Sequence, residues 1–174
     1  KQRSNLLKNN HGDRSVWLQN IQSWEHALAE YGELIHGLRE KVMQQWQPLF
    51  QQYCALLLPD IPISLDYAAA FDVEQGLLHS LDQHRTRDME RTTTQHGPHR
   101  SDLRLKTPLG IADEVLSRGQ KKLLVVALKL SQIHMLQDLG KETVVLLDDF
   151  SAELDDSAQG RLLSTLVSLN SQVF

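Results

Sequence analysis

Hydrophobic positions divide the chain into a first half that predicts helices and a second half that predicts alternating helices and strands. In the first half, apolar residues recur at steps of three and four, which is typical of a long helix packed on a partner helix. Gly32 and Gly37 within this run each cost about 1 kcal/mol relative to alanine, so a break is expected there, and Pro48 is another candidate bend. The apolar positions are Trp17, Ile21, Trp24, Leu28, Tyr31, Ile35, Leu38, Val42, Trp46 and Leu49.

Shorter elements are expected in the middle of the chain. Pro59, Asp60 and Pro62 predict a turn out of the helices. Apolar and polar residues alternate over 63–67, as in a short half-buried strand. A further helix is expected over 72–89, and strands over 92–94 and 103–106 are expected to flank a loop at 96–102.

The second half has the pattern of a parallel α/β fold. Ser117 and Gln120 match a Ser-x-x-Gln capping box, and apolar residues then recur at helical spacing until Gly140 closes the helix. The continuous apolar run 143–147 is typical of a parallel strand covered on both faces. Acidic residues at 155 and 156 predict another helix start, and 172–174 predict a further strand.

Three short motifs stand in this half: Leu-Ser-Arg-Gly-Gln at 116–120, Val-Val-Leu-Leu-Asp-Asp at 144–149 and Ser-Ala-Glu-Leu-Asp at 151–155. In this order they are typical of the signature loop, Walker B strand and D-loop of an ABC-type ATPase. Small residues at Ser117 and Gly119 allow a backbone to approach a phosphate, and the helix start there favours an anion. Each motif alone also fits an ordinary strand end or helix cap, but the three in register favour the ATPase.

Phosphoryl-transfer chemistry assigns roles to these residues. We expect Asp148 to hold Mg²⁺, directly or through a water, and Asp149 to orient or deprotonate the attacking water. Most ABC-type ATPases have glutamate at the second position, so this shorter side chain predicts slow hydrolysis. ATPases of this class place the signature loop across a dimer interface, on a nucleotide held by another subunit. The residues expected at that interface are Ser117, Arg118, Gly119 and Gln120 of the signature and Ser151, Ala152, Glu153, Leu154 and Asp155 of the D-loop.

Charge adds a candidate anion-binding region. The chain has 18 basic and 22 acidic residues, and this net charge of −4 argues against a protein that coats polyanions generally. Between Arg85 and Lys122, however, nine basic residues stand against five acidic ones. Such a run fits a solvated face as well as a phosphate-binding patch. Arg100, Lys121 and Lys122 are the candidate contacts to DNA or phosphate.

Several features are missing from the 174 residues. No Gly-x-x-x-x-Gly-Lys-Ser/Thr occurs, so the Walker A loop that holds nucleotide phosphates is lacking, and we expect this polypeptide to be an inactive piece of a longer protein. One cysteine permits no internal disulfide and makes a zinc site at His96 and His99 less favoured than a tight turn. Neither a membrane-length apolar span nor a signal peptide is present, so a cytoplasmic, nucleoid-associated protein is expected.

The motifs together resemble the RecF family of bacterial recombination mediators. The resemblance is carried by His-Gly-Pro-His-Arg-Ser-Asp at 96–102, the signature loop, the Asp-Asp pair with its D-loop, and Ser-Gln-Val-Phe at 171–174. It implies an α/β fold with a helical arm over 1–90, containing a short strand near 63–67, and a partial ABC-type, SMC-like ATPase lobe with parallel core strands over 91–174. It also implies ATP and Mg²⁺ as cofactors, a homodimer formed on ATP, and binding at single-/double-strand DNA junctions. RecO and RecR are the implied partners in loading RecA.

Two other functions remain open from the sequence. One is a different SMC-like DNA-repair ATPase, which would share the signature and Walker B motifs. The other is a non-catalytic module whose helical arm binds a protein partner and whose ATPase remnant is inert.

Overall fold

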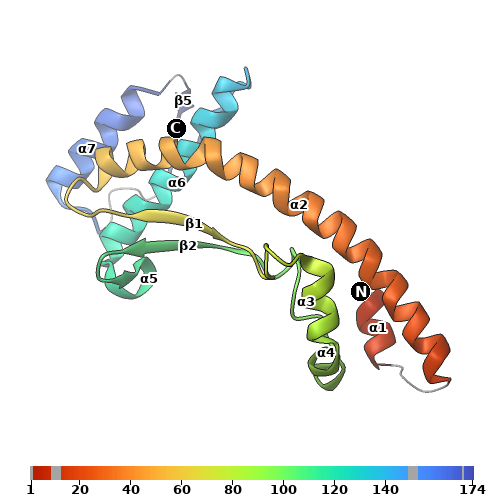
Figure 1. Cartoon of the computed structure of the whole chain (residues 1–174). Coiled ribbons are helices and arrows are strands. Elements are labelled where there is room, and N and C mark those ends of the chain that lie inside the picture. The colour runs from red at the N-terminus through yellow and green to blue at the C-terminus, as the bar shows by residue number, and fades with distance from the viewer. Residues whose placement is uncertain (1, 9–12, 149–152, 170) are drawn as a thin grey trace. The chain divides into compact units, whose positions relative to one another are not determined.

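The computed structural model describes residues 2–8, 13–148, 153–169 and 171–174. In chain order its elements are α1 (Gln2–Lys8), α2 (Arg14–Leu57), β1 (Ser64–Ala68), α3 (Leu77–Gln83), α4 (Arg85–Arg91), β2 (Asp102–Thr107), β3 (Gly110–Ile111), α5 (Ala112–Val115), α6 (Arg118–Asp138), β4 (Val144–Val145), α7 (Asp156–Val167) and β5 (Gln172–Val173) (Figure 1).

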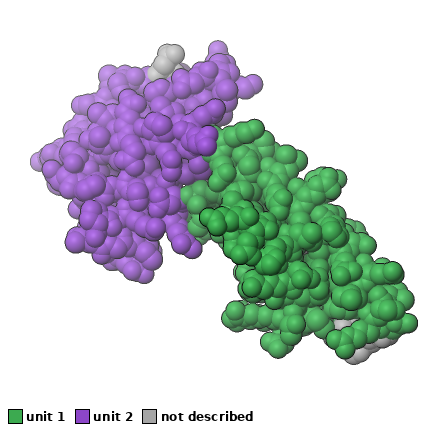
Figure 2. Space-filling view, in the orientation of Figure 1, with its two compact units in different colours: residues 1–41, 67–103 green, residues 42–66, 104–174 purple. Residues whose placement is uncertain are grey.

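The chain forms two compact units, coloured separately in Figure 2. The first comprises residues 1–41 and 67–103, and the second comprises residues 42–66 and 104–174. These ranges do not coincide with the expected arm, 1–90, and lobe, 91–174. Both α2 and β1 contribute residues to each unit.

Helix α2 is continuous over 44 residues, so the break expected at Gly32 or Gly37 is wrong, and Pro48 lies inside the helix. Packing explains Gly32. A Cβ there would collide with the Leu77 side chain and lie 3.2 Å from Cδ of Pro98. Gly32 therefore allows the segment around Leu77 to approach the helix closely, and the contacts made there offset the low helix propensity of glycine.

The buried face of α2 differs from the expected one. Ile21 and Trp46 are buried as predicted, but Tyr31 and Leu38 are 62% and 55% exposed. The buried positions instead follow another register, again with steps of three and four, and they include the polar residues Glu25 and His36. The buried residues of α2 are Ile21, Glu25, Ala29, Gly32, His36, Met43, Trp46, Phe50, Tyr53, Cys54 and Leu57.

A buried ion cluster ties the first unit together. Arg3 of α1 donates to Glu25 Oε1 at 2.7 Å, to Asp88 Oδ2 at 2.7 Å and to Thr94 Oγ1 at 2.8 Å. Arg85 donates to the other Glu25 oxygen at 2.6 Å. Glu25 and Asp88 are fully buried, so removing one partner would leave an uncompensated charge, which typically costs about 3–5 kcal/mol.

Two local expectations in this unit are wrong. The helix expected over 72–89 is two short helices, α3 and α4, which meet at His84. Residues 92–94 form no strand, because Thr92 adopts the left-handed conformation, with φ of 52°, and ends α4.

Two small sheets are present among the described residues, and the strands β1 and β2 of the first of them have residues in both units. In one sheet the order is β1-β2-β3, and β2 and β3 pair antiparallel. In the other, β4 and β5 pair parallel, with Val144 opposite Gln172 and Val145 opposite Val173. The parallel pairing expected from the sequence is therefore confirmed, as is the α/β fold class. The coverage on both faces expected for 143–147 is wrong in this chain, because Val144 and Leu146 are 59% and 77% exposed.

Helix α6 carries the signature residues and packs on the last part of α2. The Trp46 indole N–H donates to Ser131 Oγ at 2.7 Å, and both side chains are buried. Further along both helices, the Tyr53 hydroxyl lies 3.3 Å from His134 Nδ1. These contacts fix α6 within its unit. They therefore also fix the signature loop, which leads into the first residue of α6.

Candidate functional site

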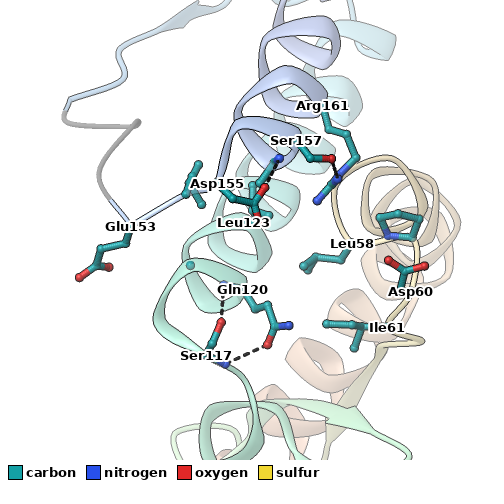
Figure 3. Close-up of a pocket in the computed structure, with 14 residues that line it drawn as sticks. Leu58, Asp60, Ile61, Ser117, Gln120, Leu123, Glu153, Asp155, Ser157 and Arg161 are labelled. Carbon is teal, nitrogen blue, oxygen red and sulfur yellow. Dashed lines mark hydrogen bonds between the residues drawn. The ribbon is translucent and has the colours of Figure 1, made fainter.

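The signature loop ends in the capping box expected from its sequence. Ser117 is the N-cap of α6, and its hydroxyl accepts a hydrogen bond from the Gln120 backbone N–H at 3.3 Å. In return, the Ser117 backbone N–H donates to Gln120 Oε1 at 2.9 Å (Figure 3). The cap fixes where the helix starts and where its positive end points.

The end of the D-loop is fixed in the same manner. Asp155 is the N-cap of α7, and its carboxylate accepts from the Ala158 N–H at 2.7 Å. The Gln159 side chain donates to the Leu154 carbonyl at 3.0 Å. Residues 154 and 155 are therefore held by α7, although residues 149–152 lie outside the described residues.

The two loops touch at Gly119. A Cβ on this residue would lie 2.5 Å from the Glu153 carbonyl oxygen and 3.6 Å from the Leu154 side chain. Glu153 itself has a φ of 68°, a left-handed conformation that is uncommon for residues other than glycine. Glycine at 119 is thus required by contact with the D-loop of the same chain, in addition to any phosphate.

A pocket of about 400 Å³ opens where these loops meet. Six of the expected site residues line it: Ser117, Gly119, Gln120, Glu153, Leu154 and Asp155. Figure 3 shows Ser117 and Gln120 at the start of α6, and Glu153 and Asp155 in the segment that leads into α7. The structure thus brings the signature and the described part of the D-loop together.

The third wall of this pocket was not expected from the sequence. It consists of the turn after α2, residues 58–61, together with Ser157 and Arg161 of α7. Arg161 donates to the Leu57 carbonyl at 3.3 Å and to Ser157 Oγ at 2.8 Å, so it joins the end of α2 to α7. Pro59 and Asp60 correctly predicted the turn, but nothing in their local pattern indicated that it would contact the signature loop.

Asp148, the expected Mg²⁺ ligand, lies at a neighbouring pocket. It is exposed and lines a largely apolar cavity of about 450 Å³ with Lys121, Lys122 and Val145 of β4. Leu123 and Leu154 line both cavities. The Walker B carboxylate and the signature turn are therefore on adjoining surfaces of one unit.

Asp149, the other carboxylate of the expected pair, lies outside the described residues. Among the described residues, no group of three or more His, Cys, Asp or Glu side chains is placed to hold a metal ion. Mg²⁺ in nucleotide sites commonly takes one or two carboxylates, with phosphates and waters as its other ligands. An exposed Asp148 at a strand end fits one such ligand.

The remaining candidate cations are on the surface. Arg118 is 89% exposed at its side chain and lies 3.8 Å from the Glu153 carboxylate, and Lys121 pairs with Asp113 at 3.0 Å. Exposed pairs of this kind contribute about 0–1 kcal/mol, so they leave both cations available to an anion. Arg100 is exposed and belongs to the other compact unit.

The loop at 96–102 forms a tight turn. The Arg100 N–H donates to the Gly97 carbonyl at 2.9 Å, and the His99 ring lies 3.1 Å from the Thr94 carbonyl. The imidazole of His96 stacks on His84, with ring centroids 4.0 Å apart.

Within the described ranges, no helix is both long and apolar enough to cross a membrane.

Comparisons with known proteins match the whole chain. It is 53% identical over 174 residues to the DNA replication and repair protein RecF of Acinetobacter baumannii, and 37% identical to that of Marinomonas sp.. It covers 48% and 46% of these proteins, so the chain spans about half the length of the curated relatives it matches. No family model matches the chain.

A solved structure agrees with the sequence comparison. The structure of the recombination mediator protein RecF-ATP in the RecFOR pathway superposes with a TM-score of 0.80 over 99% of this chain and 48% of that one, at 26% identity. The resemblance that the motifs indicated is confirmed over the full 174 residues.

Proposed function

Since the 174 residues resemble RecF proteins from end to end and span about half of their length, we propose that they supply the signature half of a RecF-type ATPase. In the whole protein, this half acts in DNA repair and recombination by closing an ATP site across a homodimer. The relatives are DNA replication and repair proteins, and a solved relative is a recombination mediator with ATP.

One observation supports the proposal most strongly. The capped turn at Ser117 and the D-loop residues 153–155 line one pocket, while Asp148 lines a different one, so the signature turn and Asp148 can serve different nucleotides. A triphosphate brought to the signature turn by a second copy would meet the N–H groups of α6, which favour anions. Ser117 and Gly119 would contact the phosphates, and Arg118 and Gln120 would lie beside them.

The other assignments follow from phosphoryl-transfer chemistry. When bound, Mg²⁺ would neutralise charge on the phosphates, with Asp148 holding it directly or through a water. Asp149 is proposed to orient the water that attacks the γ-phosphate, and its short side chain to make hydrolysis slow. Ser151, Ala152, Glu153, Leu154 and Asp155 are proposed for the dimer interface, because a D-loop lies between the Walker B strand and the signature surface.

The partners are proposed at the level of the pathway. A RecF-type protein in the RecFOR pathway implies DNA with single-/double-strand junctions, RecO and RecR as its partners. Arg100, Lys121 and Lys122 are candidate contacts to the DNA backbone, with phosphate as the common ligand. The first compact unit would serve as the arm that accompanies the ATPase lobe.

The test of this function is ATP-driven dimerisation of the full-length protein that contains this segment. Ser117→Arg places a long side chain at the exposed signature turn, and we expect it to abolish dimerisation measured by sedimentation with ATP. Binding of ATP to the monomer should be unchanged, since the altered residue would serve a nucleotide held by the other copy.

Ser23→Arg is the matched control. Ser23 is exposed on α2 and belongs to the other compact unit, so the same change there should leave dimerisation intact. Unaltered dimerisation of the Ser117→Arg variant would show that the signature role is wrong. Loss of ATP binding by its monomer would place Ser117 in the site of its own subunit.

A further inference from the structure

We propose that Gly119 and Glu153 act as positioning residues which join the signature loop and the D-loop of one subunit into a single element. This inference rests on the proposed function. In the proposed dimer, a phosphate that binds at the signature turn also sets the position of the D-loop of the same chain, because Gly119 contacts the Glu153 backbone.

The contact leaves no room for adjustment. The space beside the Gly119 Cα is closed by the Glu153 carbonyl oxygen, which is a backbone atom and cannot rotate away as the end of a side chain would. The distance of 2.5 Å to a Cβ is well inside the 3.4 Å at which ordinary contact begins. A methyl group at 119 must therefore displace either the first turn of α6 or the backbone at 153.

The first turn of α6 is held firmly. Both hydrogen bonds of the capping box between Ser117 and Gln120 are present, and the body of the helix is anchored to α2 by the buried pair of Trp46 and Ser131. A methyl group at 119 should therefore displace the backbone at residue 153, and not the first turn of α6.

The D-loop side holds a backbone conformation that needs support. Glu153 has a φ of 68°, and a non-glycine residue in this region is retained when its surroundings determine it. Directly after it, Leu154 and Asp155 are fixed to α7 by hydrogen bonds of 3.0 and 2.7 Å. The Gly119 contact and the α7 cap thus hold Glu153 from both sides, and the exposed Arg118–Glu153 pair at 3.8 Å is an accessory contact.

The test is a double-mutant cycle in the full-length protein, with ATP-driven dimerisation as the readout. We expect Gly119→Ala to weaken dimerisation in the wild-type background. The same change should weaken it less in a Glu153→Gly background, because glycine adopts positive φ readily and lets the backbone at 153 yield to the new methyl group. A coupling of about tenfold is expected, within the usual range for residues in contact.

Two further variants change the D-loop and leave the signature loop unaltered. Glu153→Val removes the carboxylate and disfavours positive φ, whereas Glu153→Asn removes the carboxylate but tolerates that conformation. Since both variants lack the carboxylate, we expect the valine variant to dimerise more weakly than the asparagine variant. Gly160→Ala is the matched control for Gly119→Ala, because nothing lies within 4 Å of a Cβ at Gly160.

The outcomes of these measurements distinguish a failure of the positioning role from a failure of the proposed function. Throughout, ATP binding by the monomer should stay near wild type at a temperature at which each variant is folded, whereas loss of the fold would abolish it. If the wild-type protein dimerises on ATP but the cycle is additive, or if valine and asparagine at 153 behave alike, the positioning role is wrong and the ATPase proposal stands. If the wild-type protein does not dimerise on ATP, both are wrong.

Discussion

The identity of several single residues is explained by how closely their side chains, or the absence of one, let other parts of the chain approach. The sequence predicts Gly119 as a phosphate-binding glycine, and its local context gives no indication that the Glu153 carbonyl occupies the space of its side chain. The capping pair Ser117 and Gln120 is predicted correctly, because both partners lie within one helical turn. Hydrogen bonds within one helical turn can be predicted from the sequence, whereas contacts between segments far apart in the sequence cannot.

His96 provides a prediction at this scale. Burial lowers the pKa of His96, and the neighbouring His84, Arg87 and Arg3 charges lower it further, against an opposing effect of Asp88. The folded protein therefore binds a proton at His96 less readily than the unfolded chain does, whose histidine has a pKa of about 6.5. The stability contributed by neutral His96 is present above that pH and is lost as the pH falls through the lower, folded pKa.

We expect His96→Phe, which keeps an aromatic ring against His84, to reduce this sensitivity to acid. The measurement is urea unfolding of both proteins at about pH 7.5 and about pH 5.5, on either side of the ordinary histidine pKa. A smaller loss of stability in the variant agrees with the account, and an equal loss would show that His96 does not contribute to it.

At the scale of elements, the sequence predicts type and order better than burial. The starts of α6 and α7, the end of α6 near Gly140 and the parallel strand β4 follow from caps and apolar runs, and all are present. The division between α3 and α4 is missed because no glycine or proline marks it. The buried face of α2 is missed because apolar residues occupy two adjacent faces of this helix, and only tertiary packing selects between them.

The glycines of α2 give a prediction at this scale. Nothing lies within 4 Å of a Cβ at Gly37, so Gly37→Ala should stabilise the protein by about 1 kcal/mol through helix propensity alone. Gly32→Ala gains the same propensity but meets Leu77, which is fully buried, and Pro98. Overpacking of this kind typically costs about 1–3 kcal/mol, so a net destabilisation is expected.

Thermal or urea unfolding of the two variants, side by side, checks this difference. The helix-propensity change is common to both, so their difference reports the contact with α3. Equal effects of the two substitutions would mean that the close approach at Gly32 does not constrain the fold.

At the scale of the whole molecule, a RecF-type protein requires more than these 174 residues, which span about half of its relatives. The proposed function makes one central claim, which is that each ATP site is shared between two copies, with Asp148 acting from one copy and Ser117 from the other.

Mixing two inactive full-length variants, Ser117→Arg and Asp148→Asn, and measuring ATP hydrolysis tests this claim most directly. In a mixed dimer, one of the two sites combines an intact Asp148 with an intact Ser117 from the opposite subunit. An equal mixture should therefore regain hydrolysis that neither variant shows alone, up to at most about half of the wild-type rate, because each mixed dimer contains one intact site of two. Hydrolysis no higher than that of either variant alone would contradict a site shared between subunits.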